Sequence, residues 1–213
     1  MSGAYRADLP KSPPDFRILR GKTNEFMIRI YEATEPSDLL AEAFARLLPQ
    51  LSDSEDQGTL QAEVLLLAEK YGVPVTYVEE PYCETMGEAE LTIYPPLTEG
   101  DVNEEGLTIL CTAGDFDVLI TGDMGSTTEK LLVETYDLPD IEVLVVGHHG
   151  SKYATTEELL EAVTPEIGVI SVGENNFGHP TAEAMDRMAW QGMTLYRTDL
   201  QGNIVIQAGG ERN

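Results

Sequence analysis

Cysteine is scarce in this 213-residue sequence, and long apolar runs are missing altogether. The two cysteines, Cys83 and Cys111, lack a CxxC spacing, so neither a disulfide framework nor a zinc knuckle is predicted. No run of about 18 apolar residues occurs, and residues 1–14 have no apolar core of the signal-peptide type. The sequence as given is therefore expected to be soluble, with no membrane span and no export signal of its own.

Basic residues are also few, with 13 Lys and Arg against 38 Asp and Glu, for a formal net charge of −25. Such a charge repels polyanions at long range and argues against tight, unassisted binding of nucleic acid. Phosphate chemistry in this chain would therefore need a metal ion. The acidic residues either form only a solvated surface or have a role in cation capture.

The remaining composition is that of a globular protein, with 42% apolar residues and enough length for one compact core. Residues 1–57 are expected to form an irregular or divergent segment and residues 58–213 the main domain, with one structural domain overall. The pattern predicts an α/β fold with a mixed sheet covered by helices. Strands are predicted at residues 26–31, 75–78, 89–94, 107–112, 118–121, 143–146, 167–172, 195–197 and 204–207. Helices are predicted at residues 36–48, 59–71, 127–134, 156–162 and 181–190.

Only three histidines occur, and two of them form His148-His149-Gly150-Ser151 directly after the apolar strand at 143–146. A strand that ends in this way places imidazoles at the carboxyl edge of a sheet, where α/β folds concentrate their active sites. Asp123 follows the strand at 118–121 in the same manner, and His179 lies in Gly178-His179-Pro180. Carboxylate and imidazole together form the mixed ligand set that suits zinc or manganese. Taken singly, each motif also fits an ordinary turn or loop.

The order and spacing of these motifs make the set specific. Over roughly residues 61–207, the chain resembles the metallo-β-lactamase-like domain at the C-terminal end of ComEC-type competence proteins. The motifs that carry the resemblance are Thr121-Gly122-Asp123, His148-His149-Gly150-Ser151, Ile170-Ser171-Val172-Gly173, Asn175-Asn176, Gly178-His179-Pro180 and Arg197-Thr198-Asp199 with Gly202.

The resemblance implies a four-layer αββα sandwich, one or two zinc or manganese ions, and hydrolysis of a phosphodiester, with DNA degraded during uptake. It also implies a parent protein embedded in the membrane, with this domain on the extracytoplasmic face. No oligomeric state is predicted. Six residues receive roles from it: Asp123 and His179 as metal ligands, His148 and His149 as the catalytic pair that contacts metal or the leaving phosphate, and Ser151 and Lys152 as substrate-binding residues, with plain surface as the alternative for Lys152.

The match breaks at the front of the domain, because the family's HxHxDH motif cannot be formed when no histidine precedes His148. Either the front half is truncated or divergent, or another polypeptide supplies it. The acidic stretch at residues 101–105 offers further ligands or is simply an acidic loop. We therefore expect weak metal binding and slow or no hydrolysis by this chain alone. The competing functional class is a non-catalytic binding or scaffolding module that keeps the hydrolase fold, and a third reading is an unrelated α/β protein.

Overall fold

The computed structural model describes residues 16–20, 25–30, 66, 69–70, 77–98 and 103–207. The chain divides into two compact units, Met1–Glu32 with Val78–Asn213 and Ala33–Tyr77. All the strands and helices that are given labels below belong to the first unit. The predicted helix at 36–48 lies outside the described residues. Within the predicted helix at 59–71, Leu66, Glu69 and Lys70 are described and helical. The predicted boundary between residues 57 and 58 stays a prediction.

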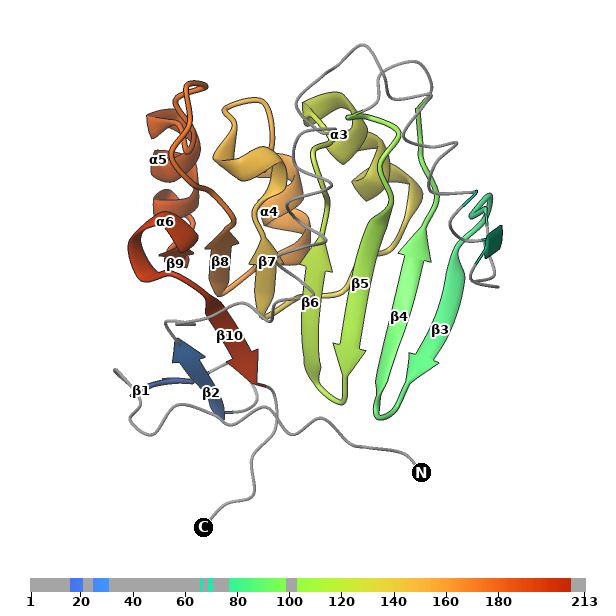
Figure 1. Cartoon of the computed structure of the whole chain (residues 1–213), viewed down its shortest axis with the longest axis horizontal. Coiled ribbons are helices and arrows are strands. Elements are labelled where there is room, and N and C mark those ends of the chain that lie inside the picture. Colours follow the sequence, from blue (N-terminus) through green and yellow to red (C-terminus); the bar gives the residue numbers. More distant parts are fainter. Residues whose placement is uncertain are drawn as a thin grey trace. The chain divides into compact units, whose positions relative to one another are not determined.

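A seven-stranded mixed sheet forms the centre of the first unit (Figure 1). Its strands lie side by side in chain order: β3 (Tyr82–Met86), β4 (Ala89–Tyr94), β5 (Thr108–Ala113), β6 (Phe116–Ile120), β7 (Val143–Val145), β8 (Ile167–Ile170) and β9 (Thr194–Arg197). Pairing is antiparallel from β3 to β6 and parallel from β6 to β9. The predicted hairpin between β5 and β6 is confirmed, and Gly114 supplies the positive φ of +63° that its tight turn requires.

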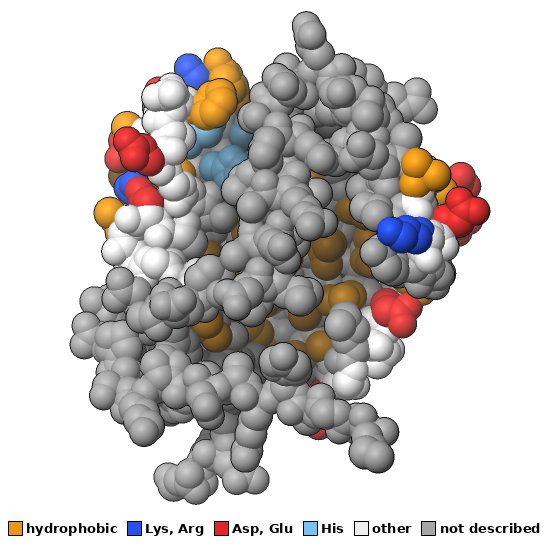
Figure 2. Space-filling model, in the orientation of Figure 1, with side chains coloured by type: hydrophobic (Ala, Val, Ile, Leu, Met, Phe, Trp, Pro, Cys, Tyr) orange, Lys and Arg blue, Asp and Glu red, His pale blue; other side chains and the backbone are white. Residues whose placement is uncertain are grey.

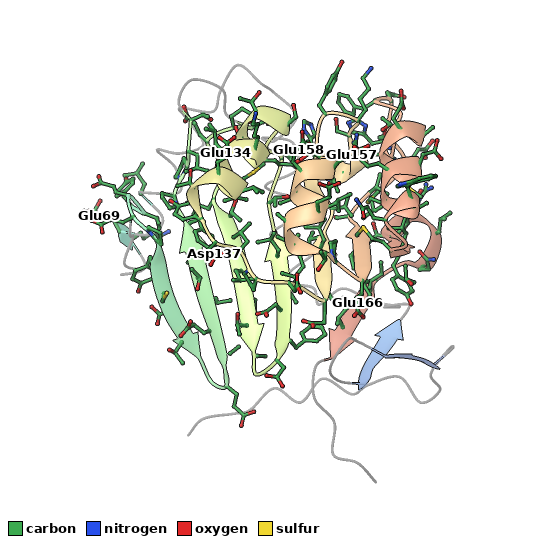
Figure 3. The ribbon with its side chains drawn as sticks, turned by 180° about the vertical axis from the view of Figure 1, so that it is seen from behind. Glu69, Glu134, Asp137, Glu157, Glu158 and Glu166 are labelled. Carbon is green, nitrogen blue, oxygen red and sulfur yellow. The ribbon has the colours of Figure 1, made fainter. Side chains whose placement is uncertain are left out.

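Helices connect the parallel strands, as such crossovers require. They are α3 (Ser126–Thr135), α4 (Glu157–Val163) and α5 (Ala182–Trp190), with a short α6 (Thr198–Gln201) and a 3-10 turn η1 (Gly147–Gly150). Figures 1 and 3, taken from opposite sides, show α3, α4 and α5 on one face of the sheet. The predicted α/β fold, with strands 118–121, 143–146 and 167–172 in one sheet and helices packed against it, is confirmed.

The strand side chains alternate between two cores, because successive residues of a strand point to opposite faces of the sheet. Leu119 of β6 packs in the cluster that contains Leu132 of α3 and Leu160 of α4. Its neighbour Val118 packs in a second cluster around Phe116 on the other face. Burial of each such side chain contributes about 1.5–3 kcal/mol, so the alternation fixes the register of β6.

A second, three-stranded antiparallel sheet contains β1 (Phe16–Arg20), β2 (Glu25–Ile30) and β10 (Ile204–Gln207). Ile204 and Ile206 of β10 pack against the second cluster, so the far face of the large sheet has an apolar partner in this strand. The described residues therefore form two sheets.

One predicted strand is wrong, and two strands were not predicted. The strand expected at 75–78 is wrong for its described residues, since Tyr77 and Val78 are not in a strand. The strand next to β4 is instead β3, which the sequence analysis missed, together with β1. Residues 82–86 (YCETM) are mostly exposed on an edge strand, so they carry no clear apolar alternation. Among the described residues, no helix combines the length and apolar character that crossing a membrane requires.

Candidate functional site

The candidate site lies where the parallel strands β6, β7 and β8 end. Parallel strands present their carboxyl ends at one edge of a sheet, so the residues that follow them meet there. Asp123 follows β6 and His149 follows β7, and the Asp123 Oδ1 atom lies 3.8 Å from His149 Nε2. The predicted convergence of these two residues is confirmed.

All three histidines of the chain gather at this edge. The His148 ring centre lies 6.4 Å from that of His149 and 5.7 Å from that of His179. We call His148, His149, His179 and Asp123 the histidine–aspartate cluster. Figure 2 shows the histidine side chains together on the surface, with hydrophobic, basic and acidic side chains in the same region.

The His148-His149 pair is held in an unusual backbone conformation. Both residues lie in the left-handed region, with φ of 48° and 55°, which costs energy for residues other than glycine. The His148 N–H donates to the Gly122 carbonyl at 2.9 Å, and the Ser151 N–H donates back to the His148 carbonyl at 2.9 Å. The first bond joins the end of β7 to the loop that carries Asp123, and the second closes the turn that contains the histidine pair.

The contacts of His149 fix its tautomer. Its Nδ1 atom lies 2.7 Å from the Ser171 carbonyl oxygen, which only accepts, so Nδ1 carries the hydrogen. In the neutral imidazole, Nε2 is then an acceptor that faces the Asp123 carboxylate.

A buried carboxylate that the sequence did not single out is linked to the histidine pair through hydrogen bonds. Glu129 of α3 is 0% exposed, and its carboxylate accepts the Thr155 N–H at 2.5 Å and the Thr156 N–H at 2.8 Å. Thr155 Oγ1 in turn accepts the Gly147 N–H at 3.1 Å, one residue before His148. Burial raises the pKa of Glu129, while the two backbone hydrogen bonds oppose that rise. Nothing in the local sequence separates this glutamate from the many others.

Arg187 of α5 holds the same loop from the other side. Its Nε donates to the Thr155 carbonyl at 2.8 Å, and its Nη2 donates to the carbonyls of Lys152 at 3.2 Å and Ala154 at 3.0 Å. Arg187 also lowers the pKa of Glu129 electrostatically. The segment that follows the histidine pair is therefore fixed between α3 and α5.

His179 reaches the cluster from the loop between β8 and α5. Glycine is required at position 150 for this approach, because an added Cβ would lie 2.5 Å from Pro180 Cβ. The Thr181 N–H donates to the Gly150 carbonyl at 2.9 Å. Partial burial lowers the pKa of His179, and His148 and His149 lower it further, whereas Asp123 raises it. Among the described residues, the buried Nδ1 atom of His179 has no hydrogen-bond partner.

The two predicted substrate-binding residues differ in accessibility. Ser151 is 2% exposed, and its Oγ accepts the Tyr153 N–H at 3.3 Å. Lys152 is exposed, with Nζ 5.0 Å from the centre of the Tyr153 ring. Their binding of substrate stays a prediction, and Lys152 is the one open to solvent.

The acidic loop before β5 has a structural role through Glu104. Its carboxylate accepts the Gly125 N–H at 3.0 Å and the Thr128 hydroxyl, which caps the start of α3. Asp101 lies outside the described residues. These bonds favour the interpretation of Glu104 as part of an ordinary acidic loop over its interpretation as an additional ligand of the site.

The donor atoms at this edge fall short of a complete metal site. Zinc sites in proteins normally have at least three protein ligands. Within the described part of the chain, no group of three or more His, Cys, Asp or Glu side chains is close enough to hold a metal ion. Asp123 and His149 approach one another, while His179 leaves a free nitrogen nearby. The described residues therefore do not fit the predicted zinc or manganese centre as a full ligand set.

Comparison with known proteins bears on the resemblance. No family model matches the chain. Competence protein ComA of Neisseria gonorrhoeae is 38% identical over 112 residues, which cover 51% of this chain and 16% of the relative. ComE operon protein 3 of Bacillus subtilis is 27% identical over 157 residues, 72% of this chain and 20% of the relative. Recombination protein 2 of Haemophilus influenzae is 36% identical over 105 residues, 49% of this chain and 13% of the relative.

The chain thus spans at most a fifth of the length of these curated relatives. Among solved structures, CmlA, a diiron beta-hydroxylase from Streptomyces venezuelae, aligns with a TM-score of 0.46 at 15% identity. That alignment covers 65% of this chain and 36% of the hydroxylase. A likeness of this degree assigns no function.

Proposed function

We propose that this chain, a metallo-β-lactamase-like domain of the ComEC type as its relatives indicate, serves DNA uptake by binding the phosphodiester backbone of DNA at the histidine–aspartate cluster. The observation that carries the proposal is the convergence of Asp123 with all three histidines at one sheet edge. The imidazoles of His148 and His179 can each donate an N–H to a phosphate oxygen, whereas the N–H of His149 is bound to the Ser171 carbonyl. If the chain is part of a membrane-embedded protein of this type, the proposal places the domain on the extracytoplasmic face of the membrane.

Hydrolysis by this chain alone is very slow or absent under this proposal. Metal-dependent hydrolases lower the pKa of a bound water far below its value in bulk water, to about 7, which provides hydroxide at neutral pH. Asp123 and His149 provide two metal-ligand atoms that face one another, fewer than the three or four protein ligands of a zinc site. The net charge of −25 adds a long-range repulsion of the polyanion.

The test combines elemental analysis of the purified chain with cleavage assays on single- and double-stranded DNA in added manganese or zinc. We expect less than one metal ion per chain and cleavage at the level of the buffer. Manganese-dependent cleavage that disappears in the Asp123→Ala variant would show instead that the cluster is an active centre. Cleavage that persists in that variant would point to a contaminating nuclease.

The binding step has a separate readout in the imidazole signals of the NMR spectrum, which come from only three histidines. Addition of a short oligonucleotide is expected to shift these signals. The competing function, a scaffolding module whose cluster binds nothing, predicts that the signals stay in place.

A further inference from the structure

The exposed ring of Phe177 is presented by a fixed loop beside the cluster. Its side chain is 84% exposed. Asn175 Oδ1 accepts the N–H groups of Phe177 at 3.1 Å and His179 at 3.0 Å. Asn175 Nδ2 donates to the carbonyls of Gly173 at 2.9 Å and His179 at 2.8 Å. One side chain therefore ties both ends of the loop together and fixes the backbone that carries Phe177.

The Phe177 ring is also aligned with the cluster. It stacks on the His179 imidazole, with ring centres 6.0 Å apart and planes 21° apart. The His179 ring lies 5.7 Å from that of His148. An exposed hydrophobic residue is ordinary by itself. Phe177 differs in two respects. Four hydrogen bonds of Asn175 hold its loop, and its ring stacks on His179 while the rest of the ring is exposed to solvent.

We propose that Phe177 is a stacking platform for a nucleobase of single-stranded DNA whose backbone lies at the histidine–aspartate cluster. Every nucleobase has a flat π-face, and stacking of that face on an aromatic ring is a common way to bind single strands without sequence preference. In a duplex, that face is covered by neighbouring base pairs, so the platform selects single strands. The inference rests on the proposed function and names its substrate class.

Stacking suits the charge of this chain. Proteins that bind single strands usually combine aromatic platforms with a basic groove. This sequence has only 13 basic residues, so Coulomb attraction to the backbone is weak over the molecule as a whole. A stacked base adds affinity that does not depend on positive charge.

The experiment compares two fluorescein-labelled oligonucleotides by anisotropy, an oligothymidylate of about ten nucleotides, within the site sizes of single-strand binders, and an abasic strand of equal length. Both strands carry the same backbone charge. In the full chain, Phe177→Ala is expected to weaken binding of the oligothymidylate by about 5- to 150-fold, the range for loss of one stacked base. Binding of the abasic strand is expected to change little, and Phe177→Trp is expected to retain the wild-type preference.

Trp190→Ala is the matched control, because Trp190 is 91% exposed and lies at the far end of α5. At 1.5 Å per residue, it is about 12 Å along the helix from the end nearest the cluster. Its loss is expected to change neither affinity.

Equal weakening of both strands by Phe177→Ala, or no weakening of either, would overturn the stacking inference while the proposed function stands. Wild-type protein that binds neither strand and shows no shift of its imidazole signals would overturn both. Tighter binding of duplex than of the single strand would also exclude the platform.

Discussion

His179 combines a partly buried imidazole with a ring nitrogen that has no partner among the described residues. Burial and the two neighbouring imidazoles lower its pKa below the ordinary value of 6.5, while Asp123 acts in the opposite direction. We predict that NMR titration places the pKa of His179 below 6.5. Asp123→Asn is expected to lower it further, because that change removes the charge that stabilises the imidazolium.

The same shift has a consequence for stability. Below pH 6.5, His179 in the unfolded chain binds a proton before the folded chain does, so the free energy of unfolding falls as the pH falls toward the folded pKa. Above pH 6.5, the contribution of neutral His179 to the free energy of unfolding is fully present. The control for Asp123→Asn is Asp137→Asn, which removes a charge from an exposed residue after α3 and should leave the His179 pKa unchanged. A His179 pKa at or above 6.5 in the wild type would contradict the burial argument.

Glu129 is the second residue whose environment sets its role. In Glu129→Gln, the side chain keeps its shape but has one acceptor oxygen for two backbone N–H groups. One buried N–H then loses its partner, which costs about 1–3 kcal/mol. We predict a loss of that size in urea unfolding, with displaced His148 and His149 signals in the NMR spectrum. Glu161→Gln, on the exposed side of α4, should leave both measurements unchanged.

At the scale of elements, the site depends on close contact between η1 and the start of α5. Gly150→Ala places a Cβ 2.5 Å from that of Pro180, at a residue with φ of +82°. We predict a destabilisation of more than about 1 kcal/mol, because alanine disfavours positive φ and the clash adds to that cost. The imidazole signals of all three histidines are expected to shift, since the two loops separate.

Gly114→Ala separates the cost of a positive φ from the cost of the clash with Pro180. Gly114 has a φ of +63°, but an added Cβ there meets no atom within 4 Å. This variant should show the conformational cost in thermal unfolding without any change in the histidine signals. Equal spectral effects of the two substitutions would mean that contact with Pro180 does not position the histidine pair.

At the scale of the whole molecule, the net charge of −25 opposes the approach of DNA that the proposed function requires. Figure 3 shows labelled acidic side chains on the helical layer, among them Glu134 of α3 and Glu157 and Glu158 of α4. An increase in salt from about 0.01 M to about 0.15 M shortens the Debye length from about 30 Å to about 8 Å. We therefore predict that affinity for single-stranded DNA rises a few-fold over this range, opposite to the behaviour of basic DNA-binding proteins.

An uncharged methylphosphonate strand of the same sequence is the control, and its affinity should not depend on salt. Affinity for the charged strand that falls as salt increases would show that a local cation, with exposed Lys152 the first candidate, outweighs the overall charge.

The sequence by itself determined the features that are local or periodic. Apolar runs predicted the parallel strands β7 and β8, and the polar residues directly after β6 and β7 predicted that Asp123 and His149 would meet, because parallel strands end at one edge. It did not predict β3, whose exposed edge position leaves no apolar pattern. The order of the short motifs also indicated the ComEC-type resemblance.

Tertiary structure alone decided how the site is held. Glu129 and Arg187 look like ordinary surface residues in the sequence, since their partners are loop backbone groups more than twenty residues away that no side-chain pattern records. Glu104 caps a helix more than twenty residues away by the same kind of long-range bond. The left-handed backbone of His148 and His149 also depends on contacts brought together by folding. Side-chain type and spacing are local properties, whereas buried hydrogen bonds to a distant backbone exist only once the chain has packed.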